Sequence, residues 1–155
     1  MGAEKARQRL IDTASPLLQE GERVEVASVA IVGSVSTKNQ VVSGVATAVL
    51  SGGLFTAFSV ALKQYVLLTD RRLLFFEMNQ LTGRPTQNVL GELPRSVLRA
   101  SDVHGRLTRV VVLTADGEAT NLKLRFPWPA RHDAEALAAA LAAPARTGGG
   151  PAAGA

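Results

Sequence analysis

The sequence predicts an α+β fold in which one antiparallel sheet lies between a helix near each end of the chain. Residues 4–20 and 131–143 space their apolar side chains as one face of a helix does. Between them, short runs rich in Val, Leu and Phe alternate with turn residues, which is typical of strands. The chain has 155 residues, 46% of them hydrophobic, which suits one domain with its own core.

The clearest single element is a β-hairpin over residues 65–77. Residues 65–69 and 73–76 are rich in the β-branched, aliphatic and aromatic side chains that favour buried strands. The polar step Asp70-Arg71-Arg72 between them fits a tight turn, although it lacks the glycine of the commonest hairpin turns. We expect the rest of the sheet to assemble around this pair of strands.

The N-terminal region predicts a helix and then a strand. Proline is costly inside a helix, so Pro16 predicts a break or a fresh start at Ser15, and Gly21 ends the element. Residues 24–35 then alternate as a strand does, and residues 33–40 form a polar loop. The apolar stripe of the helix consists of Leu10, Ile11, Ala14, Leu17 and Leu18.

Residues 41–62 form an uncharged segment of 22 residues between the first and second predicted strands. Its length reaches the ~20 apolar residues that cross a bilayer as a helix, but Gly, Ser and Thr dilute its hydrophobicity. Three interpretations stay open: a helix or helical hairpin buried against this domain or a second copy, a membrane-inserted segment, and a strand pair turning at Gly52-Gly53. The helical insertion is the leading one, with predicted membrane or oligomer contacts at Val45, Val49, Leu50, Leu54, Phe55 and Phe58.

The remainder of the chain predicts further strands and a final helix. Gly83-Arg84-Pro85 marks a turn within residues 79–88, Pro94 closes an edge strand, and Asp116-Gly117 marks a second hairpin. The expected strands are 89–93, 97–103, 107–114 and 121–126, the last with Leu122, Leu124 and Phe126 on one face. The expected organisation is an N-terminal helical segment 1–21, a domain 22–143 and a disordered tail 144–155.

Positive charge is concentrated in the strand-rich part of the chain. Residues 63–131 carry eleven basic and six acidic side chains, whereas residues 1–25 carry four and five. Such a surface can attract anionic lipid or nucleic-acid phosphate; the alternative is a solvated sheet whose cations meet water or neighbouring acids. The candidates for phosphate or lipid binding are Lys63, Arg71, Arg72, Lys123 and Arg125, with Arg95, Arg99, Arg106 and Arg109 as further members of a basic face.

The two hairpin arginines also have a purely structural interpretation. Two guanidinium groups at one turn can bind phosphate through paired hydrogen bonds. Alternatively, Asp70 caps the turn and Arg71 and Arg72 pair with Asp70, Glu77 or Glu92 on neighbouring strands. The sequence favours this second interpretation.

No arrangement for catalysis, cofactor binding or metal binding is found in the sequence. The chain has no Cys, and His104 and His132 have no carboxylate at metal-ligand spacing. Neither a Gly-x-Ser-x-Gly motif nor a glycine-rich phosphate loop is present. Trp128 lies between two prolines and is expected to cover the end of the sheet, with a membrane-interface anchor as the alternative.

The order of elements resembles the bacterial pleckstrin-homology-like (PH-like) domains. The residues that carry the resemblance are the hairpin Leu68-Thr69-Asp70-Arg71-Arg72 with its apolar flanks, the strand end Glu92-Leu93-Pro94 and the late turn Asp116-Gly117. The resemblance implies a small antiparallel β-barrel or bent β-sandwich with a C-terminal capping helix. It also implies binding of phospholipids or protein partners. The segment 41–62 departs from the family, where a short loop suffices.

These observations predict a non-enzymatic binding module that self-associates or contacts a membrane through the apolar insertion and a basic sheet surface. The expected partners are a second copy or another protein, and an anionic membrane surface. No small-molecule substrate is identified. A small-ligand carrier or small enzyme using the barrel mouth near Arg71, Arg72 and His104 is the alternative, and nucleic-acid binding ranks third. The N-terminus has no signal peptide, so the expected location is the cytoplasm or the inner face of the cell membrane.

Overall fold

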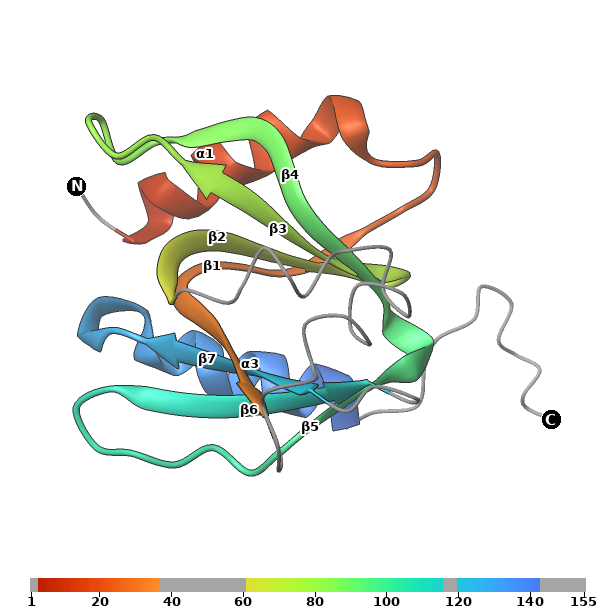
Figure 1. Ribbon diagram of the computed structural model, residues 1–155. Helices are drawn as coiled ribbons and strands as arrows, with labels where there is room; N and C mark the ends of the chain where they lie inside the picture. Colours follow the sequence, from red (N-terminus) through yellow and green to blue (C-terminus); the bar gives the residue numbers. More distant parts are fainter. Residues whose placement is uncertain (1–2, 37–60, 116–119, 143–155) are drawn as a thin grey trace, which may run out of the picture.

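The computed structural model describes residues 3–36, 61–115 and 120–142 (Figure 1). Helix α1 and helix α3 flank seven strands, β1 to β7, and three short 3₁₀ turns, η1, η3 and η4, join them. In chain order the elements are α1 (Ala3–Ala14), η1 (Ser15–Leu17), β1 (Val24–Ser36), β2 (Leu62–Thr69), β3 (Arg72–Met78), β4 (Pro85–Pro94), η3 (Arg95–Val97), β5 (Leu98–Ala100), β6 (Arg109–Ala115), β7 (Thr120–Phe126), η4 (Trp128–Ala130) and α3 (Arg131–Ala142).

All seven strands belong to one antiparallel sheet with the order β4-β3-β2-β1-β7-β6-β5. Strand β1 is long and pairs with β2 along its first part and with β7 along its second part, so it belongs to both halves of the sheet. Its curvature folds the two halves over one another (Figure 1). The edge strands β4 and β5 are not hydrogen-bonded to each other, so the sheet is open. Of the two predicted shapes, the bent sandwich describes it better than a closed barrel.

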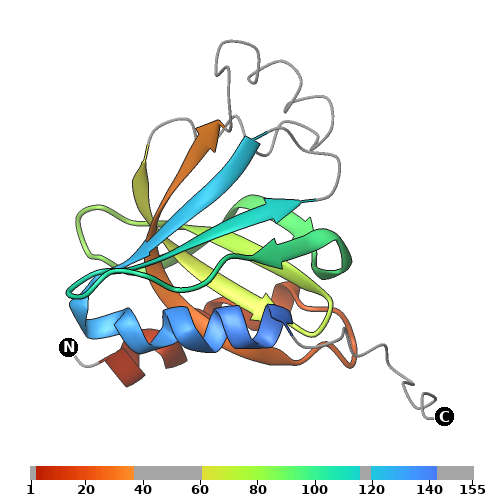
Figure 2. The ribbon, with the colours of Figure 1, turned by 90° about the horizontal axis from the view of Figure 1, so that it is seen from below.

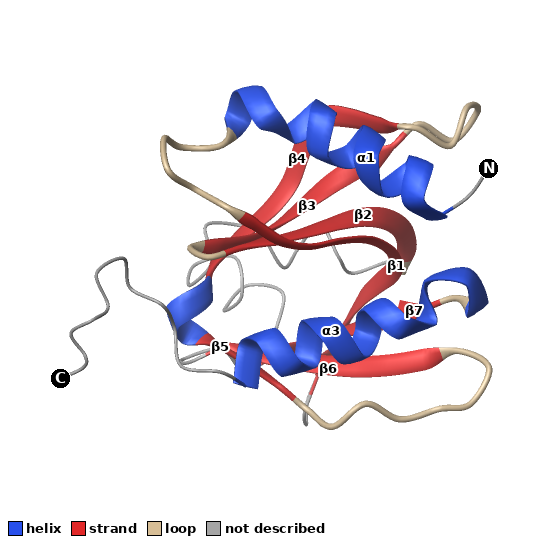
Figure 3. Ribbon diagram, turned by 180° about the vertical axis from the view of Figure 1, so that it is seen from behind, coloured by secondary structure: helices blue, strands red, loops and turns tan. Residues whose placement is uncertain are grey.

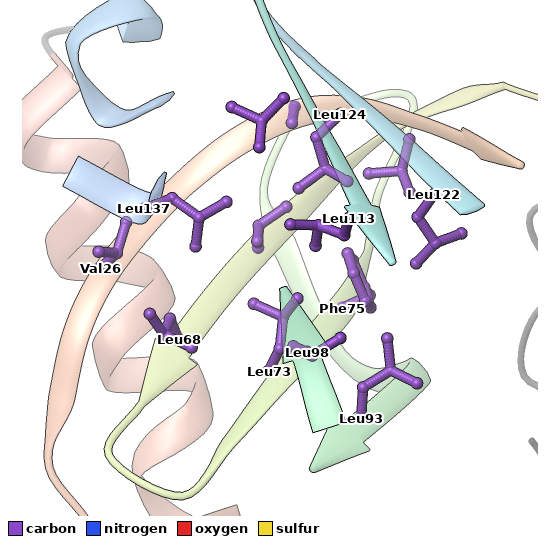
Figure 4. Close-up of a cluster of buried hydrophobic side chains, with 14 of the residues drawn as sticks. Val26, Leu68, Leu73, Phe75, Leu93, Leu98, Leu113, Leu122, Leu124 and Leu137 are labelled. Atoms are coloured by element: carbon purple, nitrogen blue, oxygen red, sulfur yellow. The ribbon is translucent and has the colours of Figure 1, made fainter. Parts of the chain in front are cut away.

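The main core lies between the two halves of the sheet. Figure 4 shows side chains from both halves pointing toward one another, among them Phe75 of β3 and Leu124 of β7. Leu137 of α3 is fully buried in the same cluster, so α3 covers this core as the predicted capping helix. The face predicted for β7 is confirmed, since Leu122, Leu124 and Phe126 are all fully buried.

A second apolar cluster lies on the outer face of the first half of the sheet, under α1. Figure 3 shows α1 on the half formed by β1 to β4 and α3 beside β6 and β7. Leu10 and Ala14 of α1 are fully buried there against Leu67 and Phe76. The two helices therefore bury different faces of the sheet, and α1 packs closely on the strands that follow it.

Several predicted elements are confirmed. Residues 65–77 form the hairpin of β2 and β3, with Leu68 opposite Leu73. Helix α1 ends at Ala14 and a 3₁₀ turn with Pro16 near its start follows, as the cost of an interior proline requires. The edge position of β4 is also confirmed, because β4 is the first strand in the order of the sheet. Pro94 suits this position, since it cannot donate a backbone hydrogen bond to a further strand.

Other predicted boundaries are wrong. The strand predicted for residues 24–35 is confirmed as β1, which ends at Ser36, but the polar loop does not begin at residue 33, because pairing with β7 extends the strand beyond it. Strand β4 begins at Pro85, opposite Met78, inside the predicted turn region. Of residues 97–103, only Leu98–Ala100 form a strand. Leu62, predicted as the last residue of the insertion, is the first residue of β2.

The helical insertion is not supported, because residues 41–60 lie outside the described residues. The turn at Asp116-Gly117 and the predicted tail 144–155 also lie outside them, as do the predicted contacts Val45, Val49, Leu50, Leu54, Phe55 and Phe58. The division between a segment 1–21 and a domain 22–143 stays a prediction. No helix of the described part of the chain is long and apolar enough to span a membrane.

Candidate functional site

The predicted phosphate-binding residues fall into two groups at opposite ends of β2. Arg71 and Arg72 lie at the β2–β3 turn, after the last residue of β2, whereas Lys63 lies at the second residue of that strand. Strand pairing brings Lys123 and Arg125 of β7 toward Lys63. The five candidates therefore cannot form one site, and each group needs a separate account.

Arg72 is bound by two carboxylates of the protein. Its Nε atom lies 2.9 Å from Glu22 Oε2 and its Nη2 atom 3.0 Å from Glu22 Oε1, which is a paired geometry. Its Nη1 atom also donates to Glu92 Oε2 at 3.1 Å, and only 14% of the side chain is exposed. The proposed pairing with Glu92 is thus present, but the main partner, Glu22, lies fifty residues away and was missed.

Arg71 and Arg95 are also occupied by local groups. Arg71 donates to Gln19 Oε1 at 2.9 Å and to the carbonyl oxygen of Glu20 at 3.2 Å. Arg95, expected on a basic face, is almost fully buried and pairs with Glu25 at 2.8 Å. It also donates to carbonyl oxygens of Thr69 and Ala140. These arginines hold loops and the end of α3 on the sheet.

The Thr-Asp-x-Arg motif ties the hairpin to the chain entering β1. Thr69 Oγ1 accepts hydrogen bonds from the backbone N–H groups of Arg71 and Arg72, and its hydroxyl donates to Glu22 Oε2 at 2.6 Å. Asp70 Oδ1 accepts from the backbone N–H of Arg23, and the Asp70 N–H donates to the Arg23 carbonyl. The motif that carries the family resemblance therefore has a structural role in this chain.

Glu22 stays ionised in spite of its burial. Its side chain has no exposed surface, and burial by itself acts to raise the pKa of the carboxyl. Hydrogen bonds from Arg72, Thr69 and the Gln19 backbone, together with the Arg72 charge, outweigh that effect and lower its pKa to about 2. The hydrogen bonds between Arg72 and Glu22 in turn raise the pKa of Arg72. The network is a buried ion pair with a structural function.

The second group forms a basic row on the outer face of the sheet. Ile31 of β1 lies directly opposite both Lys63 of β2 and Arg125 of β7, and directly paired residues share a face. Lys123 lies opposite Gly33 on the same face, while Leu124 points into the core. We call Lys63, Lys123 and Arg125 the basic row. No acidic side chain within the described ranges pairs with any of the three.

A cavity of about 330 Å³ adjoins this row. It lies between the start of α1, the outer face of β1 and β2, the β3–β4 turn and the start of α3, with a mainly apolar floor. Ser28 Oγ donates to Asp133 Oδ2 at 2.6 Å beside it. The lining includes Arg7, Lys63, Tyr65, Gly83 and Pro127, and excludes Arg71, Arg72 and His104. The cavity therefore lies away from the place expected for a barrel-mouth ligand site.

The remaining polar candidates are dispersed. His104 pairs through its backbone with Val110, and Arg109 pairs with Glu135 at 3.3 Å. Across the described parts of the chain, no group of three or more His, Cys, Asp or Glu side chains is close enough together to hold a metal ion. Trp128 was expected to cover the sheet end, and this is wrong: it is 60% exposed, with its ring 5.3 Å from the Arg131 guanidinium.

No model of a protein family matches the sequence, and no curated protein matches it either. Among solved structures, one described as showing a critical structural role for the PH and C1 domains of the Vav1 exchange factor matches with a TM-score of 0.54 and 13% identity, covering 90% of this chain and 33% of that one. The apo structure of the activated truncation of Vav1 matches with a TM-score of 0.55 and 12% identity, covering 90% and 32%.

The N-terminal PH domain of Vps36 matches with a TM-score of 0.46 and 17% identity, covering 81% of this chain and 83% of that domain. The chain thus spans about a third of the length of the Vav1 chains, and at these identities the likeness shows the fold alone. The fold assignment depends on the two Vav1 structures, whose scores exceed 0.5. The protein has a PH-like fold, an open seven-stranded antiparallel sheet with a helix near each end.

Proposed function

We propose that this protein is a non-enzymatic PH-like module that binds the anionic headgroups of a phospholipid surface through the basic row. The observation that carries the proposal is the strand register. It places Lys63 and Arg125 on either side of Ile31, with Lys123 beside them. Neighbouring strands are about 5 Å apart, so the two cations lie roughly 10 Å apart on one face.

The proposal follows from the state of these cations. Oxygen atoms of the protein already bind the side chains of Arg71, Arg72 and Arg95, so a phosphate would have to displace those oxygens. The basic row has no such partner in the described parts of the chain, so its charge is available to an external anion. A cation near an anionic leaflet contributes on the order of 1 kcal/mol of binding, which makes several neighbouring cations effective together.

The test is vesicle sedimentation with and without the basic row. We expect the double variant Lys63→Gln/Arg125→Gln to bind phosphatidylserine-containing vesicles about thirtyfold more weakly than the native protein, from about 1 kcal/mol per lost charge. Raising the salt concentration should weaken native binding, because salt screens exposed charges. The bound fraction is measured against lipid concentration by pelleting.

A matched control removes an equal number of positive charges, two, at the other end of β2. Arg23 and Arg71 lie beside the turn that follows β2, so Arg23→Gln/Arg71→Gln should leave vesicle binding within about threefold of the native value if location and not net charge decides. Equal loss in both double variants would show a net-charge effect only. Absence of native binding to anionic vesicles would refute the proposal.

We also propose that the uncharged segment 41–62 mediates self-association or a further membrane contact, through Val45, Val49, Leu50, Leu54, Phe55 and Phe58. Twenty-two residues without a charge are the observation that supports it. Because Leu62 begins β2, the informative deletion is 41–60, closed with a short Gly/Ser linker. We expect a smaller particle by light scattering, or reduced pelleting with neutral vesicles. A folded deletion variant unchanged in both measurements would contradict this second proposal.

A further inference from the structure

We infer that the protein inserts three exposed apolar tips into the bilayer, Leu81, Leu107 and Trp128, which lie at one end of the molecule. The inference depends on the proposed function and adds the orientation of the protein on the lipid surface. These are the three most exposed large hydrophobic side chains of the described residues, at 96%, 71% and 60% of their full accessible surface. We call them the apolar tips.

The tip at Leu81 is held firmly by the β3–β4 turn. Asn79 Oδ1 accepts hydrogen bonds from the backbone N–H groups of Leu81 and Thr82, and the Gly83 N–H donates to the Asn79 carbonyl at 2.7 Å. The hydroxyl of buried Tyr65 donates to the Gly83 carbonyl at 2.6 Å, and burial raises the pKa of that hydroxyl. The turn thus presents a nearly fully exposed leucine from a fixed backbone.

The other two tips also belong to short, well-bonded connections. Leu107 follows Gly105, whose φ of +98° favours glycine, and Arg109 Nη1 donates to the Gly105 carbonyl at 2.9 Å. Trp128 begins η4 between two prolines, and the Ala130 N–H closes that turn on the Pro127 carbonyl at 2.8 Å. Little conformational entropy therefore remains to be lost when these tips enter another phase.

The three tips lie at the same end of the molecule. Figures 1 and 2 both show the β3–β4 turn, the end of the β5–β6 loop next to β6 and the start of α3 at the left, where the N-terminus also lies. The cavity confirms part of this arrangement, because Gly83 and Pro127 line it together. Lys63 lines it as well, so the end of the basic row reaches the same region.

Cations accompany each tip. Arg84 follows the Leu81 turn, Arg106 precedes Leu107, and Arg131 stacks on Trp128. Within the described residues, none of these three side chains forms an ion pair with an acid. Apolar side chains beside unpaired arginines match the boundary of an anionic bilayer, where acyl chains lie beneath phosphate groups.

The spacing of the tips favours a bilayer over a protein partner. A protein interface usually has a continuous apolar centre with a polar rim. Here the apolar side chains come from three separate connections, with charged and polar side chains among them. A fluid lipid surface can surround each isolated tip, and tryptophan is enriched at the headgroup level of membranes.

Trp128 provides a direct test because it is the sole tryptophan of the chain. On binding vesicles of phosphatidylcholine and phosphatidylserine, its emission should shift to the blue, and lipids brominated on their acyl chains should quench it. The double variant Leu81→Gln/Leu107→Gln should bind vesicles at least about tenfold more weakly, since burying even one leucine side chain stabilises the bound state by more than a tenfold change in affinity requires. Leu17→Gln is the matched control, because Leu17 is 40% exposed in η1, beyond the other end of α1.

The outcomes separate this inference from the proposed function. Native binding that needs the basic row, with no Trp128 quenching and no effect of Leu81→Gln/Leu107→Gln, would overturn the inference and leave the proposed function standing. No binding to anionic vesicles would overturn both. A blue shift without vesicles, together with faster sedimentation of the protein, would show that a second copy covers this end, and would also overturn the inference. Quenching of Trp128, together with weaker binding of Leu81→Gln/Leu107→Gln and unchanged binding of Leu17→Gln, would support it.

Discussion

Arg72→Met should destabilise the protein by about 3–5 kcal/mol at neutral pH, because the substitution leaves the buried Glu22 carboxylate without its cation. Methionine fills much of the volume of the arginine stem, so the loss reports the ion pair more than packing. A domain is usually stable by only about 5–15 kcal/mol, so this is a large share of the total. Urea denaturation followed by far-UV circular dichroism measures the change.

The pH dependence identifies the group responsible. The pKa of Glu22 is about 2 in the folded protein against 4.5 as the ordinary value, so its contribution is present above about pH 4.5 and is lost as pH falls toward 2. In Arg72→Met the Glu22 carboxyl has no guanidinium beside it, so the folded state no longer lowers its pKa in this way. The stability difference between variant and native protein should therefore narrow as the pH falls from about 4.5 toward 2.

The control for this experiment is Arg106→Met, which removes a cation that is exposed and has no acidic partner among the described residues. It should change stability by no more than about 0.5 kcal/mol, as most surface substitutions do. A loss in Arg72→Met that is equally small, or one that is independent of pH, would contradict the assignment of the ion pair.

Leu10→Ala should cost about 2–5 kcal/mol, because Leu10 of α1 is fully buried against the outer face of the sheet. The substitution removes apolar contacts with Leu67 and Phe76 and leaves a space that the rigid strands can fill only partly. The denaturation midpoint of the whole protein should fall in one transition, since the helix covers a core shared with β2 and β3.

Lys5→Ala on the same helix is the matched control, because Lys5 is exposed and its substitution should have almost no effect. If Leu10→Ala released only the helical signal at low denaturant while the sheet unfolded at its native midpoint, residues 1–21 would be a separate segment. That result would agree with the division predicted from the sequence and contradict an integral role for α1.

Local patterns in the sequence were sufficient to predict most of the described helices and strands, but not their boundaries. Alternation over a few residues determined that Leu122, Leu124 and Phe126 share a buried face, because successive side chains of any strand point to opposite sides. The break after Ala14 followed from the missing N–H of Pro16. The hairpin of β2 and β3 followed from two apolar runs around a polar step. The capping role predicted for Asp70 is wrong, because Thr69 Oγ1 accepts from the backbone N–H groups of the turn, whereas Asp70 Oδ1 accepts from the backbone N–H of Arg23.

The availability of the charged residues could not be predicted in the same way. Arg71, Arg72, Lys63 and Arg125 look equivalent in the sequence, because each is a cation in or beside a strand. Arg72 forms an ion pair with Glu22, which lies fifty residues away in the sequence, and no spacing of nearby residues predicts that contact. Leu81 and Leu107 were missed for a related reason, since a leucine in a turn looks apolar whether or not another element covers it.

Within the described residues, the sequence by itself determined most of the helices and strands, their order and the inward face of each strong strand, because those properties depend on neighbours a few residues apart. Only the tertiary structure decided which cations are neutralised, that Lys63 and Arg125 flank Ile31, and which apolar side chains stay uncovered. Strand order and register bring together residues that are far apart in the chain, and the free energy of a charge depends on those distant neighbours.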